Sequence, residues 1–184
     1  MDYYRLRTDL GFPKRWYLGD INKVEDEWAF KQGKPVDEKK FQNLTVKITK
    51  KGASMDFTET SAFIAPIVSE KFAECLSGYK DEIQLIPVKV PATKEKYFIM
   101  VVKNTIDCVD ESKSMFSKFK KDDSVRPDLA GEYREIGILK INTSVVDKAI
   151  FRLGKFDICI IVNGDIKREL EKAKVTGARF LLVS

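Results

Sequence analysis

The fold class is decided by one segment near the end of the chain, Asp157–Val183, which reads DICIIVNGDIKRELEKAKVTGARFLLV. Its apolar start, Asp157–Val162, has the composition of a buried strand. The next residues, Asn163-Gly164-Asp165, form a turn with an N-cap, and Ile166–Ala173 is the predicted helix. A last strand follows at Arg179–Val183. A strand, a helix and a strand joined by a short crossover allow a parallel pair of strands here.

Upstream of this segment, predicted strands outnumber helices. Alternating or apolar, β-rich runs predict strands at Tyr3–Arg7, Arg15–Ile21, Leu44–Lys50, Ile83–Val90, Tyr97–Val102 and Ile136–Ile141. A helix is predicted after the N-cap residue Ser69, with Gly78 placed to end it. The stretch Lys31–Lys40 is a predicted loop, and residues 112–128 are polar and irregular. We therefore expect a single α+β domain, with a mixed, mostly antiparallel sheet, a few helices and a C-terminal strand–helix–strand unit.

Length and composition are those of an ordinary globular domain. The 184 residues can form one good-sized core, and 43% of them are hydrophobic while 33% are charged. No apolar run approaches the roughly 18–20 residues that a membrane span needs. The first residues, Met1–Arg5, do not resemble a signal peptide. These features predict a cytoplasmic protein without a membrane partner.

The chain contains no histidine, and its three cysteines are far apart. The absence of histidine excludes Ser-His-Asp and Cys-His catalytic systems and the common histidine-ligated zinc sites. The cysteines form no C-x-x-C pair, and no Walker-type loop or G-x-G-x-x-G occurs. We therefore expect a binding protein and not an enzyme, with no catalytic residue, no metal and no cofactor.

One type of catalysis that needs no histidine remains compatible with a motif in the middle of the chain. Glu111-Ser112-Lys113, preceded by Asp107 and Asp110, has the E-x-K spacing of magnesium-dependent nucleases. There a carboxylate holds the metal while a lysine stabilises the developing charge. The competing interpretation is a solvated loop, which we prefer because charged residues are common at the ends of strands.

The alternative function is a nucleic-acid-binding module that uses Lys113–Lys121. This segment interleaves lysines with Phe116 and Phe119, a pattern that can grip phosphates and stack bases, but Asp122 and Asp123 follow and cancel part of the charge. The net charge of +5 is spread along the chain without a basic arm, which argues against nucleic acid as the partner. Folding can still gather these charges on one face.

Residues 16–28 have the composition of a protein-binding surface. Tryptophan and tyrosine are the residues that most often anchor interfaces, and acidic residues steer basic partners such as nucleases. The predicted anchors are Trp16, Tyr17 and Trp28, and the predicted steering charges are Asp20, Glu25 and Asp26. The competing interpretation places both tryptophans in the core and leaves the acids to solvate a loop.

Several short motifs occur in a recognisable order along the chain. They are Met55-Asp56-Phe57, Ile67–Phe72, Ile86-Pro87-Val88, Ile106–Asp110, Ile150–Leu153 and Thr176–Phe180. In this order they resemble the immunity-protein family encoded beside bacterial polymorphic toxins and type VI secretion effectors, once described only as a Myxococcus-type domain of unknown function. The resemblance covers roughly residues 30–184, and the first thirty residues match loosely. It implies a protein that binds and neutralises a cognate toxin inside the producing cell.

The positions that carry this resemblance have structural interpretations. They are Asp56, Ser69, Phe151, Arg152, Gly177 and Phe180. Ser69 caps a helix, Phe151 belongs to the core and Gly177 takes a positive φ. Arg152 is either an internal ion-pair partner or an exposed contact. The resemblance transfers no toxin-contacting residue, and it leaves the toxin and the oligomeric state open, although the net positive charge argues against a DNA-mimicking inhibitor.

Overall fold

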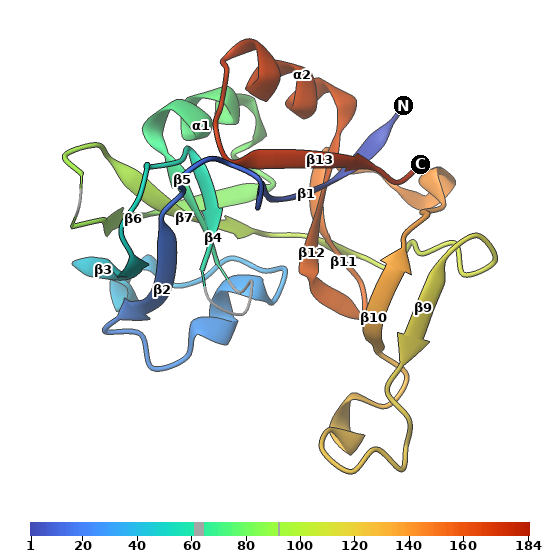
Figure 1. Ribbon diagram of the computed structural model, residues 1–184. Helices are drawn as coiled ribbons and strands as arrows, with labels where there is room; N and C mark the ends of the chain where they lie inside the picture. Colours follow the sequence, from blue (N-terminus) through green and yellow to red (C-terminus); the bar gives the residue numbers. More distant parts are fainter. Residues whose placement is uncertain (61–64, 92) are drawn as a thin grey trace.

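The computed structural model describes residues 1–60, 65–91 and 93–184. Within them the strands fall into three sheets, accompanied by two α-helices (Figure 1). Most neighbouring strands pair antiparallel, while β3 (Leu44–Lys50) pairs with β6 (Ile83–Lys89) and β8 (Thr105–Ile106) with β11 (Ile150–Leu153) in parallel. The predicted α+β class with mostly antiparallel pairing is confirmed, and the strands are divided among several sheets.

The first sheet has six strands. In spatial order they are β2 (Tyr17–Asn22), β3 (Leu44–Lys50), β6 (Ile83–Lys89), β7 (Tyr97–Val102), β5 (Pro66–Ser69) and β4 (Phe57–Glu59). The apolar strands β6 and β7 form its centre and pair from Ile83↔Val102 to Val88↔Tyr97. The predicted bounds of β3 and β7 are confirmed. The sequence of β3 alternates apolar and polar residues, and that of β7 is a continuous apolar run, so both strands have a clear local pattern.

The second sheet contains the C-terminal unit. Its spatial order is β13 (Ala178–Leu182), β1 (Tyr3–Thr8), β12 (Phe156–Asn163), β11 (Ile150–Leu153) and β8 (Thr105–Ile106). Strands β12 and β13 run in the same direction, but β1 lies between them and pairs antiparallel with both. The predicted strand–helix–strand unit is therefore present, but its two strands do not form the direct parallel pair that the short crossover allowed, because the N-terminal strand β1 bonds to both.

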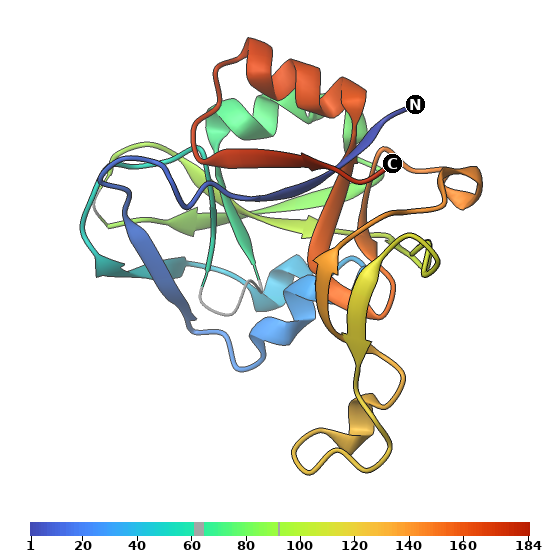
Figure 2. The same ribbon diagram turned by 45° about the vertical axis from the view of Figure 1, so that its right-hand side comes forward.

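Two α-helices lie side by side on one side of the molecule, α1 (Glu70–Cys75) and α2 (Gly164–Lys172) (Figures 1 and 2). The predicted cap at Ser69 is confirmed, since its Oγ accepts a hydrogen bond from the Phe72 N–H at 3.2 Å. Helix α1 ends before Gly78, because the Leu76 N–H bonds the Ala73 carbonyl and tightens the last turn. A 3-10 turn, Ser77–Tyr79, follows it. No described helix is long and apolar enough to cross a membrane.

A shared core joins the two large sheets. One cluster combines residues of the second sheet, such as Leu6 and Ile160, with Phe57 of the first sheet, Phe72 of α1 and Leu170 of α2. All of these side chains are buried. Burying an aliphatic or aromatic side chain of this size contributes about 1.5–3 kcal/mol, so the cluster couples the sheets and helices strongly.

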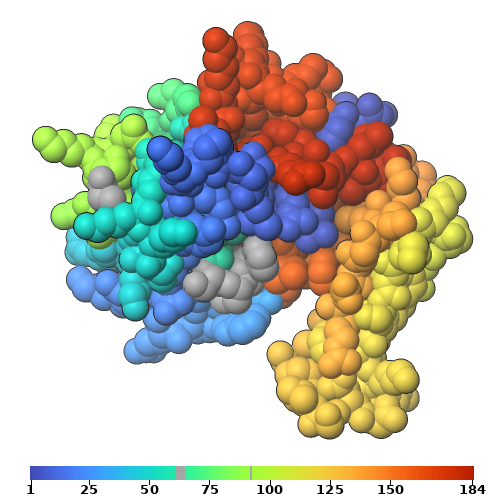
Figure 3. Space-filling view, viewed as in Figure 1, coloured from blue at the N-terminus to red at the C-terminus, as the bar shows by residue number. Residues whose placement is uncertain are grey.

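The third sheet is a two-stranded hairpin, β9 (Met115–Lys118) and β10 (Tyr133–Ile138), that stands out from the body (Figures 1 and 3). The prediction of an irregular 112–128 segment therefore missed a strand, and the strand predicted at Ile136–Ile141 begins and ends earlier. Across the hairpin, the ring of Phe116 packs edge-on against Tyr133, with centroids 5.1 Å apart. The remaining 3-10 turns of the C-terminal half are Pro127–Leu129 and Thr143–Val145.

Candidate functional site

A 3-10 helix, η1 (Glu27–Lys31), carries Trp28, the most exposed of the three predicted aromatic anchors. Its N-cap is Asp26, whose Oδ1 accepts a hydrogen bond from the Trp28 N–H at 2.9 Å. Side chains three residues apart share a face in this type of helix. Asp26, Ala29 and Gln32 therefore share one face, Glu27 and Phe30 another, and Trp28 and Lys31 the third.

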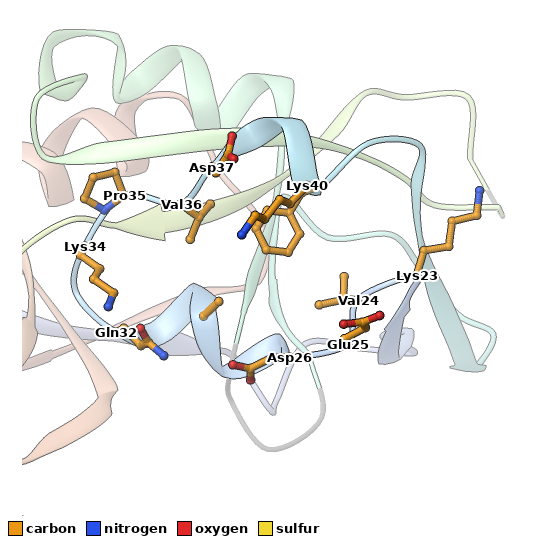
Figure 4. Close-up of a pocket in the computed structure, with 12 residues that line it drawn as sticks. Lys23, Val24, Glu25, Asp26, Gln32, Lys34, Pro35, Val36, Asp37 and Lys40 are labelled. Carbon is orange, nitrogen blue, oxygen red and sulfur yellow. The ribbon is translucent and has the colours of Figure 1, made fainter.

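A hollow of about 670 Å³ lies between η1 and a second 3-10 turn, η2 (Glu38–Lys40) (Figure 4). Its apolar lining comes from Val24, Ala29, Val36 and Phe41. Its charged residues are Lys23, Glu25, Asp26, Lys34, Asp37 and Lys40. Glu25 and Asp26 lie on the η1 side, and Asp37 and Lys40 lie on the η2 side (Figure 4). An apolar floor with a charged rim is the arrangement that protein interfaces use.

The walls of this hollow are held by contacts to the sheets. The Gln84 side chain of β6 accepts a hydrogen bond from the Val36 N–H and donates one to the Val36 carbonyl, each at 2.9 Å. Gly33 takes φ 65° and lies so close to β8 that an added Cβ would be 1.8 Å from Thr105 Oγ1. The hollow is therefore formed before any partner arrives, which lowers the entropic cost of binding.

Trp28 is an exposed aromatic side chain held in place by a buried cation. It is 51% exposed, and Lys31 Nζ lies 4.1 Å from the centroid of its ring. The Lys31 side chain is only 9% exposed and pairs with Asp157 Oδ1 of β12 at 2.7 Å. This pair fixes Lys31, which in turn limits the motion of the indole.

Arg152 holds the same helix from inside the protein. Its side chain is fully buried, and its guanidinium donates hydrogen bonds to the Phe30 carbonyl at 3.2 Å and to the Asp157 carbonyl at 2.5 Å. Burial lowers the pKa of Arg152 to about 10, against the opposing effects of Asp157 and Glu59. Of the two interpretations, the structure places Arg152 inside, where it ties η1 to the second sheet.

Trp16 is a core residue and not a surface anchor. It is 1% exposed, its Nε1 donates a hydrogen bond to Thr58 Oγ1 at 2.8 Å, and its ring lies 5.5 Å from that of Tyr97. Trp16 lies one residue before β2 and packs in the same core cluster as Leu18, and Thr58 satisfies the indole N–H. The prediction that Trp16 contacts a partner is therefore corrected.

The remaining five predicted binding residues do not form one cluster. Tyr17 is 40% exposed and begins β2, while Glu25, Asp26 and Trp28 lie just beyond its other end, and Asp20 is exposed between them. At about 3.3 Å per residue, the 6 residues of β2 separate these ends by roughly 17 Å. Glu25 and Asp26 thus line the hollow beside η1, whereas Asp20 lies within β2 and Tyr17 at its far end.

Asp56 connects three segments that are far apart in the chain. Its carboxylate accepts hydrogen bonds from the Thr176 N–H at 2.8 Å, from Thr176 Oγ1 at 2.9 Å and from Ser69 Oγ at 2.7 Å, and it pairs with Lys71 at 2.7 Å. Burial raises the pKa of Asp56, but the bonds from Lys71, Thr176 and Ser69 outweigh it and hold the pKa below its usual range. The residue is structural in this setting.

Gly177, Phe151 and Phe180, which also carry the family resemblance, have structural roles as well. Gly177 takes φ 80°, and an added Cβ would lie 2.4 Å from the Phe57 carbonyl oxygen. Phe151 is fully buried in a cluster with Tyr3, and their rings meet at 6.1 Å. Phe180 is half-buried against the core that both sheets share.

The charged side chains of the Glu111-Ser112-Lys113 motif form hydrogen bonds and ion pairs within the protein. Glu111 Oε1 accepts hydrogen bonds from Tyr133 Oη and from Lys118 Nζ, both at 2.6 Å, and Lys113 pairs with Asp110 at 2.9 Å. These pairs also neutralise two lysines of the proposed nucleic-acid segment. In the described part of the chain, no group of three or more acidic or cysteine side chains is arranged to hold a metal ion.

The family model of an immunity protein family, Imm11, matches residues 67–184. The chain belongs to the Imm11 immunity protein family. No curated protein matches it. The Imm11 match begins in β5 and covers both α-helices and the hairpin, whereas Asp56, η1 and the hollow precede it.

Sequence reasoning missed the hollow of this Imm11 protein. Asp26, the N-cap residue, is followed by Ala29 and Gln32 at intervals of three residues. This spacing was a local signal for one face of a 3-10 helix. The opposing wall had no such signal, because it depends on the distant contact between Gln84 and Val36.

Proposed function

We propose that this Imm11 protein binds a cognate protein toxin and blocks its activity by contact, without catalysis, inside the bacterium that produces the toxin. Such pairs belong to polymorphic toxin or type VI secretion systems. The observation that carries the proposal is the family match over residues 67–184. Two features support binding as the mode of action: the half-exposed Trp28 of η1, and the preformed hollow that another face of the same helix lines.

The proposed contact surface consists of Trp28, Asp20, Glu25, Asp26 and the η1 hollow. Trp28 offers a large area whose orientation is already fixed by Lys31, so little entropy is lost when a partner covers it. Glu25 and Asp26 are exposed and would attract a basic toxin surface, such as that of a nuclease. Nanomolar affinity, about −12 kcal/mol, is within reach of an interface that buries about 1,600 Å².

Protection in living cells tests the function. A candidate toxin domain, taken from the genes next to the one that encodes this protein, is expressed alone and together with this protein. We expect growth to stop with the toxin alone and to continue when both are made. Unchanged growth arrest, with this protein present and folded, would contradict the proposal.

Calorimetry tests the contact surface. Trp28→Ala is expected to weaken toxin binding by about 30-fold or more, as loss of an interface hot spot does, while stability changes little because the side chain is half-exposed. Glu25→Lys/Asp26→Lys is expected to slow association and reduce its dependence on salt. Met115→Ala, which truncates an exposed side chain on the hairpin, is the matched control and leaves binding unchanged. If all three variants bind the toxin equally well, the contact surface lies elsewhere.

A further inference from the structure

A second hollow, of about 500 Å³, lies at the opposite end of β2 from η1. Four cations line it together with apolar and aromatic side chains. The cations are Lys14, Arg15, Lys50 and Lys51, and the other side chains belong to Leu10, Phe12 and Tyr17. None of the described residues that line it carries a carboxylate. We call this feature the basic hollow.

Two backbone segments that are far apart in the sequence bring these cations together. The Ala53 N–H donates a hydrogen bond to the Lys14 carbonyl at 2.7 Å, and the Trp16 N–H donates one to the Ala53 carbonyl at 3.1 Å. Lys14 takes φ 51°, a left-handed conformation that this pairing maintains. A Cβ at Gly52 would lie 2.3 Å from the Lys14 carbonyl oxygen, so the two segments touch. The basic hollow is therefore a fixed part of the fold.

The charge of the basic hollow is not compensated within the described part of the chain, where none of its four cations forms an ion pair. Asp9, at the start of the same loop, accepts a hydrogen bond from the Gly11 N–H at 3.0 Å. The Arg15 guanidinium lies 3.9 Å from the centroid of the Tyr17 ring, and Lys50 Nζ lies 5.3 Å from it. Cations gathered without counter-charges repel one another and attract an anionic partner.

The walls favour protein over nucleic acid as that partner. Leu10 is 53% exposed, and with Phe12 it gives the basic hollow an apolar side that suits a side chain packed next to a carboxylate. Single-stranded nucleic acid is bound by stacking bases on open aromatic faces along a charged groove. Here Arg15 already covers one face of the Tyr17 ring, and the cations surround one compact hollow.

We propose that the basic hollow receives an acidic segment of the toxin, with carboxylates beside an apolar side chain. This inference rests on the proposed function and deepens it. The acidic surface around Glu25 and Asp26 and the basic hollow lie roughly 17 Å apart along β2. A standard interface covers about 800 Å² of each partner, roughly 28 Å across, so one toxin can cover both ends. Opposite charges at the two ends of β2 would then fix the orientation in which the toxin docks.

Charge reversal in the basic hollow tests this inference. Lys50→Glu/Lys51→Glu is compared with Lys120→Glu/Lys121→Glu, which makes the same change in net charge on exposed hairpin lysines. Binding of the toxin domain is measured by calorimetry at low and high salt. We expect at least tenfold weaker binding and a smaller salt dependence for the first variant, and less than threefold change for the second. Lys51→Gln, a milder change, is expected to weaken binding in the same direction.

The outcomes separate this inference from the proposed function. If the wild type binds and protects while Lys50→Glu/Lys51→Glu binds equally well, the basic hollow is not a toxin contact and the proposed function stands. If both double variants lose the same affinity, only net charge matters and the inference is wrong. If the wild type does not bind the toxin, both proposals fail. If charge reversal abolishes binding to a single-stranded oligonucleotide and leaves toxin binding intact, the basic hollow is a nucleic-acid site.

Discussion

At the scale of single residues, Asp56 links the turn before β4, the start of α1 and the turn before β13. The Asp56 side chain is 13% exposed, so its contacts with Thr176, Ser69 and Lys71 are shielded from bulk water. Hydrogen bonds to charged groups contribute about 1.5–3 kcal/mol each when measured by mutation. The stability of the junction therefore depends on the carboxylate charge.

Substitution of Asp56 measures that dependence. Asp56→Asn is expected to lower the free energy of unfolding by about 2 kcal/mol at pH 7, as measured by urea denaturation. Glu70→Gln is the control, because it breaks a pair with Lys96 whose side chains are 47% and 71% exposed. Such a surface pair contributes at most about 1 kcal/mol. Equal losses in both variants would show that Asp56 has no special role.

The same residue predicts a pH dependence. The folded-state pKa of Asp56 lies below its ordinary value of 3.8, so its stabilising effect is fully present above that value. The effect is lost as the pH falls through the lower folded pKa. The difference in unfolding free energy between the wild type and Asp56→Asn should therefore shrink as the pH falls from about 5 to about 2. These end points lie roughly one to two pH units above and below the ordinary pKa of the carboxyl group. A constant difference across this range would be evidence against a depressed pKa.

Substitutions at three glycines separate the energetic cost of backbone strain from the cost of steric overlap. Gly177→Ala combines φ 80° with a Cβ 2.4 Å from the Phe57 carbonyl oxygen, so we expect a loss of about 2–4 kcal/mol. Gly131→Ala has φ 90° and no atom within 4 Å of the new Cβ, and should cost about 1 kcal/mol. Gly78→Ala has neither feature and should change stability by less than about 0.5 kcal/mol. Thermal unfolding of the three variants tests this order.

At the scale of elements, η1 depends on contacts that local sequence does not encode. Its N-cap, Asp26, is a local signal. Its position is set by Lys31 and Arg152, whose partners lie in β12 and at the end of η1 itself. The composition of residues 16–28 therefore predicted a protein-binding surface but not which of its side chains are exposed. Trp16 and Trp28 were both predicted as anchors, although Trp16 is buried.

Fluorescence quenching tests the arrangement of the two tryptophans. Acrylamide is expected to quench one component of the wild-type emission, from Trp28, and to leave the emission of buried Trp16 largely unaffected. Trp28→Phe should remove the quenched component. If Trp28→Phe leaves the quenching unchanged, the account of η1 is wrong.

Strands differ in how far the sequence predicts them. Leu44–Lys50 and Tyr97–Val102 were predicted with the bounds that the structure has, because their pattern is local. Strand β9 was missed, since it has four residues and its partner β10 lies beyond a long excursion. The insertion of β1 between β12 and β13 is likewise a pairing between the two ends of the chain, which no local pattern specifies.

At the scale of the whole molecule, we propose that residues 1–184 form one immunity unit, although the Imm11 match begins at residue 67. The matched part includes β12 and β13, which both hydrogen-bond to β1 from outside that range. A fragment of residues 67–184 would expose the facing edges of these strands and lose Leu6 and Phe57 from the shared core. We expect it to be unfolded by circular dichroism. A cooperative thermal transition in this fragment would instead show that the matched region folds alone.

The folded protein is proposed to act by binding its toxin, and one titration measures this directly. A candidate toxin domain, taken from the genes next to the one that encodes this protein, is titrated into the purified protein by calorimetry, and its toxic activity is measured in the same mixtures. The account predicts nanomolar binding, about −12 kcal/mol, and loss of toxin activity as complex forms. Absence of binding between the two folded proteins, with toxin activity unchanged, would contradict it.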